Sequence, residues 1–207
     1  MNYLIIYAHP SSKSKNARLK DFVEQHLKSE GHQVITRDLY ELGFQPVLSL
    51  EDIQGQMSGA PDSDVSEEQN YIAAADCLIF IHPIWWTGLP AILKGYIERV
   101  FSYGFAYRYD KGVQKGLLKG KSCVIINTQG KSSAEYQAIG MDKALRLTSD
   151  TGIYRYVGLA VKKHFFFTEA DRASESEVAT WMSTLEKYFQ LGKDLKASSE
   201  FPKSSLS

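Results

Sequence analysis

The sequence predicts a doubly wound α/β domain, in which helices cover both faces of one parallel sheet. Five apolar runs alternate with amphipathic helical segments along the chain, and the third run, Cys77–Ile81, is apolar on both faces, as in parallel sheets. The 207 residues are enough for one domain with a sizeable core. Hydrophobic residues make up 43% of the chain and charged residues 23%. These proportions are typical of a globular domain and exclude a disordered, collagen-like or coiled-coil chain.

The predicted strands are short apolar runs, each followed by turn residues. They cover Tyr3–Ala8, Gln33–Arg37, Cys77–Ile81, Ser122–Asn127 and Tyr154–Val161, with Phe165–Phe167 as a continuation of the last.

The predicted helices fall between and after these strands, where apolar residues recur at helical spacing. They cover Ala17–Ser29, Ser66–Ala75, Leu89–Phe101, Ala138–Ser149 and Ser174–Leu191. Ser66 and Gln69 have the spacing of a capping box at a helix start. The segments Leu39–Ser66 and Ser102–Leu118 are rich in glycine and are predicted to be irregular, and the polar tail Lys196–Ser207 is expected to be mobile.

The charge balance and the cysteines indicate a cytoplasmic protein. Lys plus Arg and Asp plus Glu each number 24, so the chain gives no electrostatic reason to expect a nucleic acid or a membrane surface as partner. The apolar start, Tyr3–Ala8, is too short for the core of a signal peptide. Cys77 and Cys123 lie inside apolar runs, as reduced core thiols do, and the Cys and His spacing matches no metal site.

The loop after the first strand has the composition of a phosphate site. His9–Asn16 carries hydroxyls, two lysines and the first amides of a helix, which together bind phosphate. The loop lacks the Gly-x-Gly-x-x-Gly pattern of a Rossmann dinucleotide site and the Gly-Lys-Ser/Thr of a P-loop. A polar helix cap without a ligand is the alternative interpretation.

The loop after the third strand, Pro83–Pro90, contains two adjacent tryptophans, Trp85 and Trp86. Two tryptophans at the end of a strand form a flat apolar wall suited to a planar ring. The alternative is that they anchor the core or a subunit interface.

The loop after the fourth strand, Asn127–Gly130, is followed by Tyr136. Its small residues allow backbone to approach the edge of a ring, and the tyrosine can donate a hydrogen bond. Ligands of doubly wound sheets bind beyond the carboxyl ends of the strands. A phosphate loop, an aromatic wall and a polar edge at this one place predict a flavin site.

Several segments resemble the flavodoxin-like NAD(P)H:quinone oxidoreductases of the DT-diaphorase type, over roughly residues 1–190. The strongest match is Pro90–Gly95 with Glu98–Phe101. The other matching segments are Tyr7–His9 with Asn16, Arg37–Tyr40 with Phe44 and Pro46, Glu68–Gln69 with Ala74–Asp76, and Phe105–Tyr109 with Asp110–Gly112.

The resemblance implies a three-layer flavodoxin-like fold with a five-stranded parallel sheet of order 2-1-3-4-5. Residues 1–193 would form one flavin-binding domain, and residues 194–207 a mobile tail. The flavin, FAD or alternatively FMN, would be held without a covalent bond in a homodimer with active sites at the subunit interface. It would take a hydride from NADH or NADPH and pass it to a quinone, or to a nitro or azo compound, in a ping-pong sequence.

The resemblance also implies the site residues. His9, Ser14, Lys15 and Asn16 would hold the pyrophosphate, and Gln69 would lie near the adenine. The isoalloxazine would lie on Pro83, Ile84, Trp85 and Trp86, with its other edge at Thr128, Gln129, Gly130 and Tyr136. Tyr107 and Tyr109 would reach the neighbouring subunit's pocket and act there with Tyr136, unless they serve only interface packing.

The chain departs from the pattern of the human-type enzymes at Asp142, since those enzymes have a histidine six residues after the tyrosine of the fourth loop. A carboxylate about 5 Å from a reduced, anionic flavin would cost roughly 3 kcal/mol at an effective dielectric constant near 20. We therefore expect Asp142 to point away from the site and to cap or pair on its own helix. Tyr136 would then bond to flavin O2.

Two other function classes fit parts of this pattern. Relatives of the family include ancillary flavin-binding subunits of potassium-efflux systems, which dock on a membrane transporter. A flavodoxin acting as a one-electron carrier is the other class, but flavodoxins are usually shorter and strongly acidic, whereas this chain has zero net charge.

Overall fold

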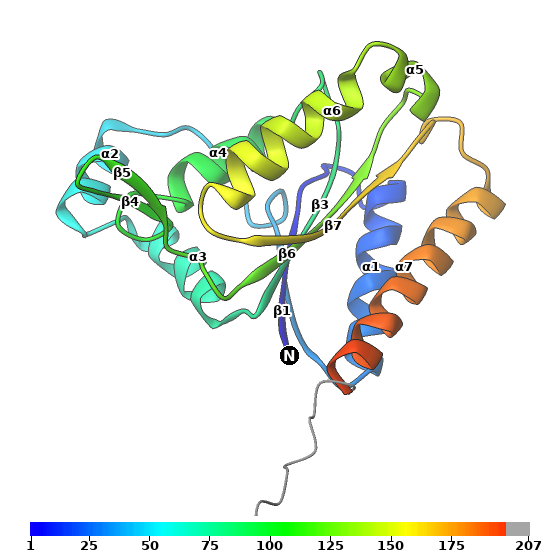
Figure 1. Ribbon diagram of the computed structural model, residues 1–207, viewed down its shortest axis with the longest axis horizontal. Coiled ribbons are helices and arrows are strands. Elements are labelled where there is room, and N and C mark those ends of the chain that lie inside the picture. The colour runs from blue at the N-terminus through cyan, green and yellow to red at the C-terminus, as the bar shows by residue number, and fades with distance from the viewer. Residues whose placement is uncertain (198–207) are drawn as a thin grey trace, which may run out of the picture.

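The computed structural model describes residues 1–197, and five of its strands form one parallel sheet in the order β2-β1-β3-β6-β7 (Figure 1). These strands are β1 (Asn2–Tyr7), β2 (Gln33–Asp38), β3 (Cys77–Pro83), β6 (Ser122–Thr128) and β7 (Ala160–Phe167). A separate antiparallel hairpin consists of β4 (Tyr107–Asp110) and β5 (Val113–Gly116).

One face of the sheet is covered by α1 (Lys15–Ser29) and α7 (Glu175–Ala197), which lie side by side in Figure 1. Leu19 and Val23 of α1 and Leu185 of α7 are fully buried against alternate residues of β1, β3, β6 and β7. The helix α1 begins where the Ser14 hydroxyl accepts a hydrogen bond from the Ala17 amide at 3.0 Å. The apolar residues that the sequence places at helical spacing therefore cover this face of the sheet.

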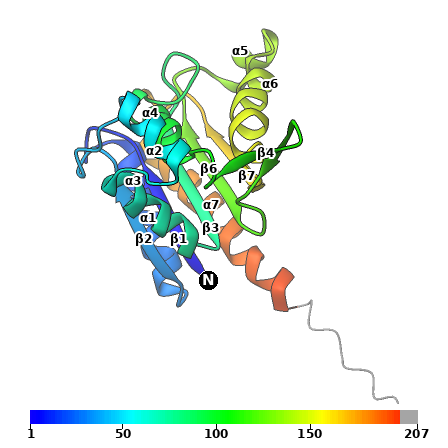
Figure 2. The same ribbon diagram turned by 90° about the vertical axis from the view of Figure 1, so that its left-hand side faces the viewer.

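The opposite face is covered by α3 (Ser63–Ala74), α4 (Ala91–Val100) and the π-helical segment η1 (Leu147–Arg155), which follows α5 (Ser133–Ala138) and α6 (Met141–Arg146) (Figure 2). Ile72, Tyr96 and Tyr154 fill this layer and are fully buried. The described chain is thus the predicted three-layer α/β fold, and within residues 1–197 no helix is long and apolar enough to cross a membrane.

The strand predictions need two corrections. Ser102–Leu118 is not a plain loop, because it contains the hairpin β4–β5, and the sheet order is therefore 2-1-3-6-7 rather than 2-1-3-4-5 in chain numbering. Tyr154 lies in η1 and not in a strand, so that the last strand begins only at Ala160. Apolar content alone does not distinguish a buried helical turn from a buried strand.

The helix predictions were wrong at four places. The segment 39–66 contains α2 (Leu50–Ser58), and α3 starts at Ser63, so that Ser66 is not its cap. The predicted helix 138–149 is replaced by α5, α6 and η1. The helix α7 extends to Ala197, beyond the predicted end at Leu191 and into the predicted tail. The remainder of that tail, residues 198–207, lies outside the described residues.

A buried arginine holds the segment 39–66 against the domain. The Arg99 Nε on α4 donates to both carboxylate oxygens of Asp52 on α2, at 2.9 and 3.0 Å, and its Nη1 donates to Asp64 on α3 at 2.6 Å. The same guanidinium donates to the carbonyl of Gln45 at 3.0 Å. These polar contacts anchor three segments to one buried side chain, an arrangement that hydrophobic periodicity does not reveal.

The approach of Pro46 to α4 makes Gly95 a sensitive position. A Cβ atom at residue 95 would lie 2.0 Å from the Pro46 carbonyl oxygen and 2.6 Å from its carbonyl carbon. We expect Gly95→Ala to lower the free energy of unfolding in urea by about 3 kcal/mol, since backbone must move.

Gly152→Ala is the matched control, because its Cβ would have only an ordinary 3.5 Å contact with the Leu147 carbonyl oxygen. We expect it to change the unfolding free energy by at most about 1 kcal/mol. Equal effects of the two substitutions would contradict the close approach of Pro46.

Candidate functional site

Three loops meet at Thr128, the last residue of β6. Its hydroxyl oxygen accepts a hydrogen bond from the Asn16 side-chain amide at 2.7 Å. Its carbonyl oxygen accepts one from the Ile84 amide at 2.8 Å. The loops after β1 and β3 are therefore both tied to the end of β6, as the topology predicts for the carboxyl edge of a parallel sheet.

The loop after β1 presents His9 and Ser14 beside this junction. The Nδ1 atom of His9 accepts a hydrogen bond from the Ser11 amide at 3.0 Å, and the His9 ring lies 5.5 Å from that of Trp85. Burial lowers the pKa of His9. The Lys15 ammonium is turned to the carbonyl of Ala170, to which it donates at 2.5 Å, so that it ties the start of α1 to the segment after β7.

The loop after β3 contains a tight turn with two strained residues. Trp85 and Gly88 exchange backbone hydrogen bonds at 3.2 and 3.0 Å, and the residues between them, Trp86 and Thr87, have φ values of 51° and 57°. Positive φ at such residues costs about 1–3 kcal/mol each and is concentrated at functional sites. The Trp86 side chain is completely exposed and Trp85 is 41% exposed, so the tryptophans do not anchor this chain's core.

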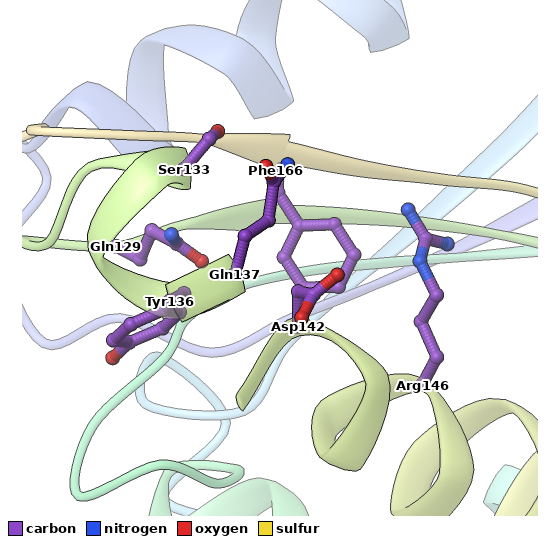
Figure 3. A pocket seen from close by; sticks show the side chains of 7 residues that line it. All are labelled: Gln129, Ser133, Tyr136, Gln137, Asp142, Arg146 and Phe166. Carbon is purple, nitrogen blue, oxygen red and sulfur yellow. The ribbon is translucent and has the colours of Figure 1, made fainter. Parts of the chain in front are cut away.

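The loop after β6 opens onto a cavity of about 240 Å³. Figure 3 shows its lining residues, which are Gln129, Ser133, Tyr136, Gln137, Asp142, Arg146 and Phe166. Gln129 is only 4% exposed. At Gly130 a Cβ atom would lie 2.9 Å from the Asp171 carboxylate, so a larger residue there would have to displace that side chain.

The prediction that Asp142 points away from this cavity was wrong. Asp142 lines the cavity together with Tyr136 (Figure 3), and its Oδ1 atom is buried without a hydrogen-bond partner among the described residues. The reason is the left-handed Gly140, with φ of 74°, which turns the chain between α5 and α6. Asp142 follows in the first turn of α6 and therefore lies beside Phe166 of β7.

Two further oxygens of the site lack a donor. The Asn16 Oδ1 and Gln129 Oε1 atoms are buried and have no hydrogen-bond partner in the part of the chain that the structure describes. A buried acceptor without a donor costs about 1–3 kcal/mol. Both atoms thus fit a ligand that brings N–H or O–H groups to this edge of the sheet.

The structure does not bring the remaining predicted residues to this junction. The amide of Gln69 donates to the Val100 carbonyl at 3.1 Å and to the Ser102 hydroxyl at 2.9 Å. Tyr107 and Tyr109 lie on the hairpin β4–β5, far from α5 along the long axis of the molecule (Figure 1). Within one chain these tyrosines do not cover the Tyr136 cavity.

A second cavity, of about 350 Å³, lies between the Trp85–Gly88 turn and η1. Its apolar lining includes Ile84, Leu89 and Ile153, but two buried histidines, His82 and His164, also line it. Sequence reasoning missed both histidines. A histidine within an otherwise apolar buried strand must find a polar partner, and that was the available signal.

Comparison with known proteins agrees with this architecture. The model of a family described as having a flavodoxin-like fold matches residues 1–189. A Haemophilus influenzae protein named as an uncharacterized NAD(P)H oxidoreductase is 41% identical over 160 residues, covering 77% of this chain and 79% of that protein.

Two more distant relatives show the same similarity. NAD(P)H dehydrogenase [quinone] 1 of Rattus norvegicus is 33% identical over 178 residues, covering 76% of this chain and 65% of that protein. The solved structure of an NAD(P)H:quinone oxidoreductase from Methanothermobacter marburgensis superposes with a TM-score of 0.82 at 28% identity, covering 90% of this chain and 96% of that one.

The Thr128 hydroxyl can be tested directly. Thr128→Val leaves the buried Asn16 amide without its acceptor, and we expect the free energy of unfolding to fall by about 1–3 kcal/mol. Thr128→Ser keeps the hydroxyl and should lose less. Urea unfolding measures all three proteins.

Thr180→Val is the control, because this exposed hydroxyl bonds only to the Ser176 carbonyl of its own helix, at 2.9 Å. We expect its effect to stay within about 0.5 kcal/mol. The role assigned to Thr128 is refuted if both valine substitutions cost the same.

Proposed function

Because the chain belongs to the flavodoxin-like fold family, we propose that it is a flavin-dependent NAD(P)H:quinone oxidoreductase. The observation that supports this most is the junction at Thr128, where a helix N-terminus, an exposed tryptophan turn and a polar loop converge. The names of the relatives from Haemophilus influenzae, Rattus norvegicus and Methanothermobacter marburgensis point to the same chemistry.

The residues of the junction suit a flavin. His9, Ser14, Lys15 and Asn16 would hold its phosphate side. Gln69 lies outside the junction, with its side-chain amide bonded to Val100 and Ser102, and we propose it for the adenine side of the longer FAD form rather than FMN. Pro83, Ile84, Trp85 and Trp86 would carry the ring system, with Thr128, Gln129, Gly130 and Tyr136 at its polar edge. The hydroxyl and N–H groups of a flavin would supply donors that the buried Asn16 and Gln129 oxygens lack.

The bound flavin would accept a hydride from NADH or NADPH and pass it to a quinone, or to a nitro or azo compound, at the same face. The protein supplies position. The hydrogen bonds to Thr128 fix the loops after β1 and β3 relative to each other. The strained Trp85–Gly88 turn leaves the Trp86 side chain exposed, so that a planar ring could stack on it. Sharing of one pocket by donor and acceptor implies ping-pong kinetics.

We also propose a cytoplasmic homodimer in which residues 1–193 form the flavin-binding domain. The tyrosines Tyr107 and Tyr109 would then complete the partner's pocket, since they do not cover the pocket of their own chain (Figure 1).

The first test is flavin binding and turnover. We expect the purified protein to be yellow, with one flavin per chain, and to reduce menadione with NADH or NADPH along parallel double-reciprocal lines. Trp86→Ala should weaken flavin binding by about tenfold or more, because one aromatic stacking contact contributes about 1–3 kcal/mol. Mass analysis of the released flavin distinguishes FAD from FMN.

Met57→Ala is the control, since Met57 is 80% exposed on α2 and outside the three loops; it should bind flavin as the wild type does. A colourless protein that takes up neither FAD nor FMN would overturn the proposal. Flavin binding without NAD(P)H oxidation would favour the ancillary-subunit alternative, and a one-electron carrier would stop at the semiquinone.

The position of Asp142 yields a second test. Asp142 and Tyr136 line the same cavity (Figure 3), so Asp142→Asn removes negative charge from the proposed site of the ring edge. A like-charge pair at about 5 Å and an effective dielectric constant near 20 costs roughly 3 kcal/mol. We expect Asp142→Asn to speed flavin reduction by NADPH at least tenfold in stopped flow, and Tyr136→Phe to slow it.

Asp21→Asn is the charge-matched control, because Asp21 on α1 pairs with Lys20 at 2.8 Å outside the site. It should leave the rate unchanged. A flavin reduction rate of Asp142→Asn within threefold of the wild type would mean that the flavin does not lie beside Asp142 in this cavity.

The assembly is tested by sedimentation at micromolar concentration. Trp86, Tyr103, Tyr109 and Val113 are exposed apolar side chains, and their exposed fractions are 101%, 44%, 52% and 56%. A second copy that buries these side chains would remove them from water, so we expect a dimer of the 23.3 kDa chain. A species of 23.3 kDa alone would contradict the shared pocket.

A further inference from the structure

A line of four buried polar side chains crosses from β3 through β6 and β7 to η1. The His82 Nε2 atom lies 3.0 Å from the Asn127 side-chain nitrogen, and the Asn127 side-chain oxygen lies 2.7 Å from His164 Nε2. The His164 Nδ1 atom lies 2.7 Å from the Asp150 Oδ1 atom. All four residues are at most 5% exposed, and none is among the residues proposed to hold the flavin.

The protons of this line can be counted from its β3 end. The His82 Nδ1 atom lies 3.0 Å from the Pro83 carbonyl oxygen, which can only accept, so Nδ1 carries a proton. Neutral His82 then accepts at Nε2 from the Asn127 amide, whose second N–H donates to the His82 carbonyl at 3.1 Å.

The count leaves one extra proton at the other end. The Asn127 carbonyl oxygen only accepts, so His164 Nε2 carries a proton. The contact between His164 Nδ1 and the Asp150 carboxylate needs another proton between two acceptors. The pair therefore holds one proton more than a neutral histidine with a carboxylate.

Reversing the Asn127 amide does not remove the extra proton. The reversed amide would place the extra proton on His82 and bring two carbonyl oxygens to 3.1 Å of each other. Complete burial lowers the pKa of His82 to about 4. Both facts favour the orientation observed, with the proton at His164 and Asp150.

We propose that the His164–Asp150 pair takes up and releases one proton, and that the pair fixes η1 against β7 while it holds this proton. The segment η1 leads directly into Tyr156, whose hydroxyl lies 3.1 Å from that of Tyr109 and whose carbonyl accepts from Gln114 at 2.6 Å. The pair thereby positions the hairpin β4–β5 as well as one wall of the 350 Å³ cavity. His164 is a positioning residue in this arrangement.

The groups that face the pair set the direction of the switch. Arg146 of α6 lies 3.8 Å from the Asp150 carboxylate, the Ser149 hydroxyl donates to it at 3.0 Å, and His82 faces His164 across Asn127. Burial lowers the pKa of His164, against the effect of Asp150. Burial acts to raise the pKa of Asp150, but the hydrogen bond and charge of His164, together with Ser149 and Arg146, lower that pKa overall. The proton therefore resides on His164 and is released as the pH rises.

Release of the proton breaks one hydrogen bond. A neutral His164 can donate either to Asp150 or to Asn127, but not to both. With the Asn127 amide in its present orientation, the ring must then lose its bond to η1 or its bond to β6. Reversal of the amide would keep both bonds of His164, but only by giving up both Asn127 contacts with His82 and bringing two carbonyl oxygens to 3.1 Å.

The experiment is histidine NMR on the full chain labelled with nitrogen-15, from pH 5 to pH 9, with His164→Gln to assign the signals. We expect His164 to show two protonated ring nitrogens at the acid end and one after release. Amides of residues 147–155 should exchange faster, beyond the intrinsic effect of pH, once the proton has left. His82 is an internal reference and should keep one proton throughout.

Asp150→Asn is the decisive variant, because its amide can donate to His164 Nδ1 and complete the whole line without any extra proton. His164 should then keep a single proton, on Nε2, from pH 5 to pH 8. The proposal is overturned if wild-type His164 carries one proton at pH 5, or if Asp150→Asn titrates with the wild-type midpoint. Neither readout needs flavin or turnover, so failure here is distinct from failure of the proposed function.

Discussion

The candidate site depends on one residue at the end of one strand. Thr128 receives a side-chain hydrogen bond from Asn16 and a backbone hydrogen bond from Ile84. The backbone amide of the next residue, Gln129, donates a hydrogen bond to the Phe167 carbonyl at 2.9 Å. The start of α1, the residue after β3 and the end of β7 are thus all bonded to two consecutive residues, Thr128 and Gln129, at the end of β6. Because these bonds are buried, their geometry is fixed before any ligand arrives.

This fixed edge contrasts with the parts of the molecule that remain open. Trp86 is fully exposed on a turn with two positive φ angles, and the hairpin with its tyrosines lies at the other end of the molecule from α5 and the Tyr136 cavity (Figure 1). A single chain provides the edge of the sheet, where the Asn16 Oδ1 and Gln129 Oε1 atoms have no hydrogen-bond partner among the described residues. The proposed cover comes from a second copy, which is consistent with apolar side chains that one chain leaves in water.

The sequence was sufficient to predict the sheet and the edge of the sheet at which the three loops meet. Apolar runs such as Cys77–Ile81 indicate strands of a parallel sheet, and the carboxyl ends of parallel strands lie at the same edge of the sheet. Local pattern failed where long-range contacts decide the structure. The helix α2 is held by Arg99, 47 residues away from Asp52 in sequence, and Tyr154 looks like a strand residue although a π-helix buries it.

The sequence predicted which loops come together at the candidate site, but it did not predict where the side chains in them point. Trp85, Trp86 and Thr128 stand where the pattern placed them, whereas the Lys15 ammonium turns to Ala170 and the Gln69 amide turns to Val100. Asp142 was expected outside the site because its carboxylate would repel a reduced, anionic flavin, yet it follows the turn at Gly140 and lines the cavity beside Tyr136. The line from His82 to Asp150 depends on strand register and on η1, and neither is visible in a single sequence.

The most direct test of the central claim is hydrogen–deuterium exchange of the full chain with and without added FAD. Binding at the Thr128 junction predicts simultaneous protection of the three loops, 9–16, 83–90 and 128–136, in one saturable transition. The hairpin 107–116 should be protected only where dimers form. Protection confined to one loop, or located at the amino ends of the strands, would contradict a flavin site built on Thr128.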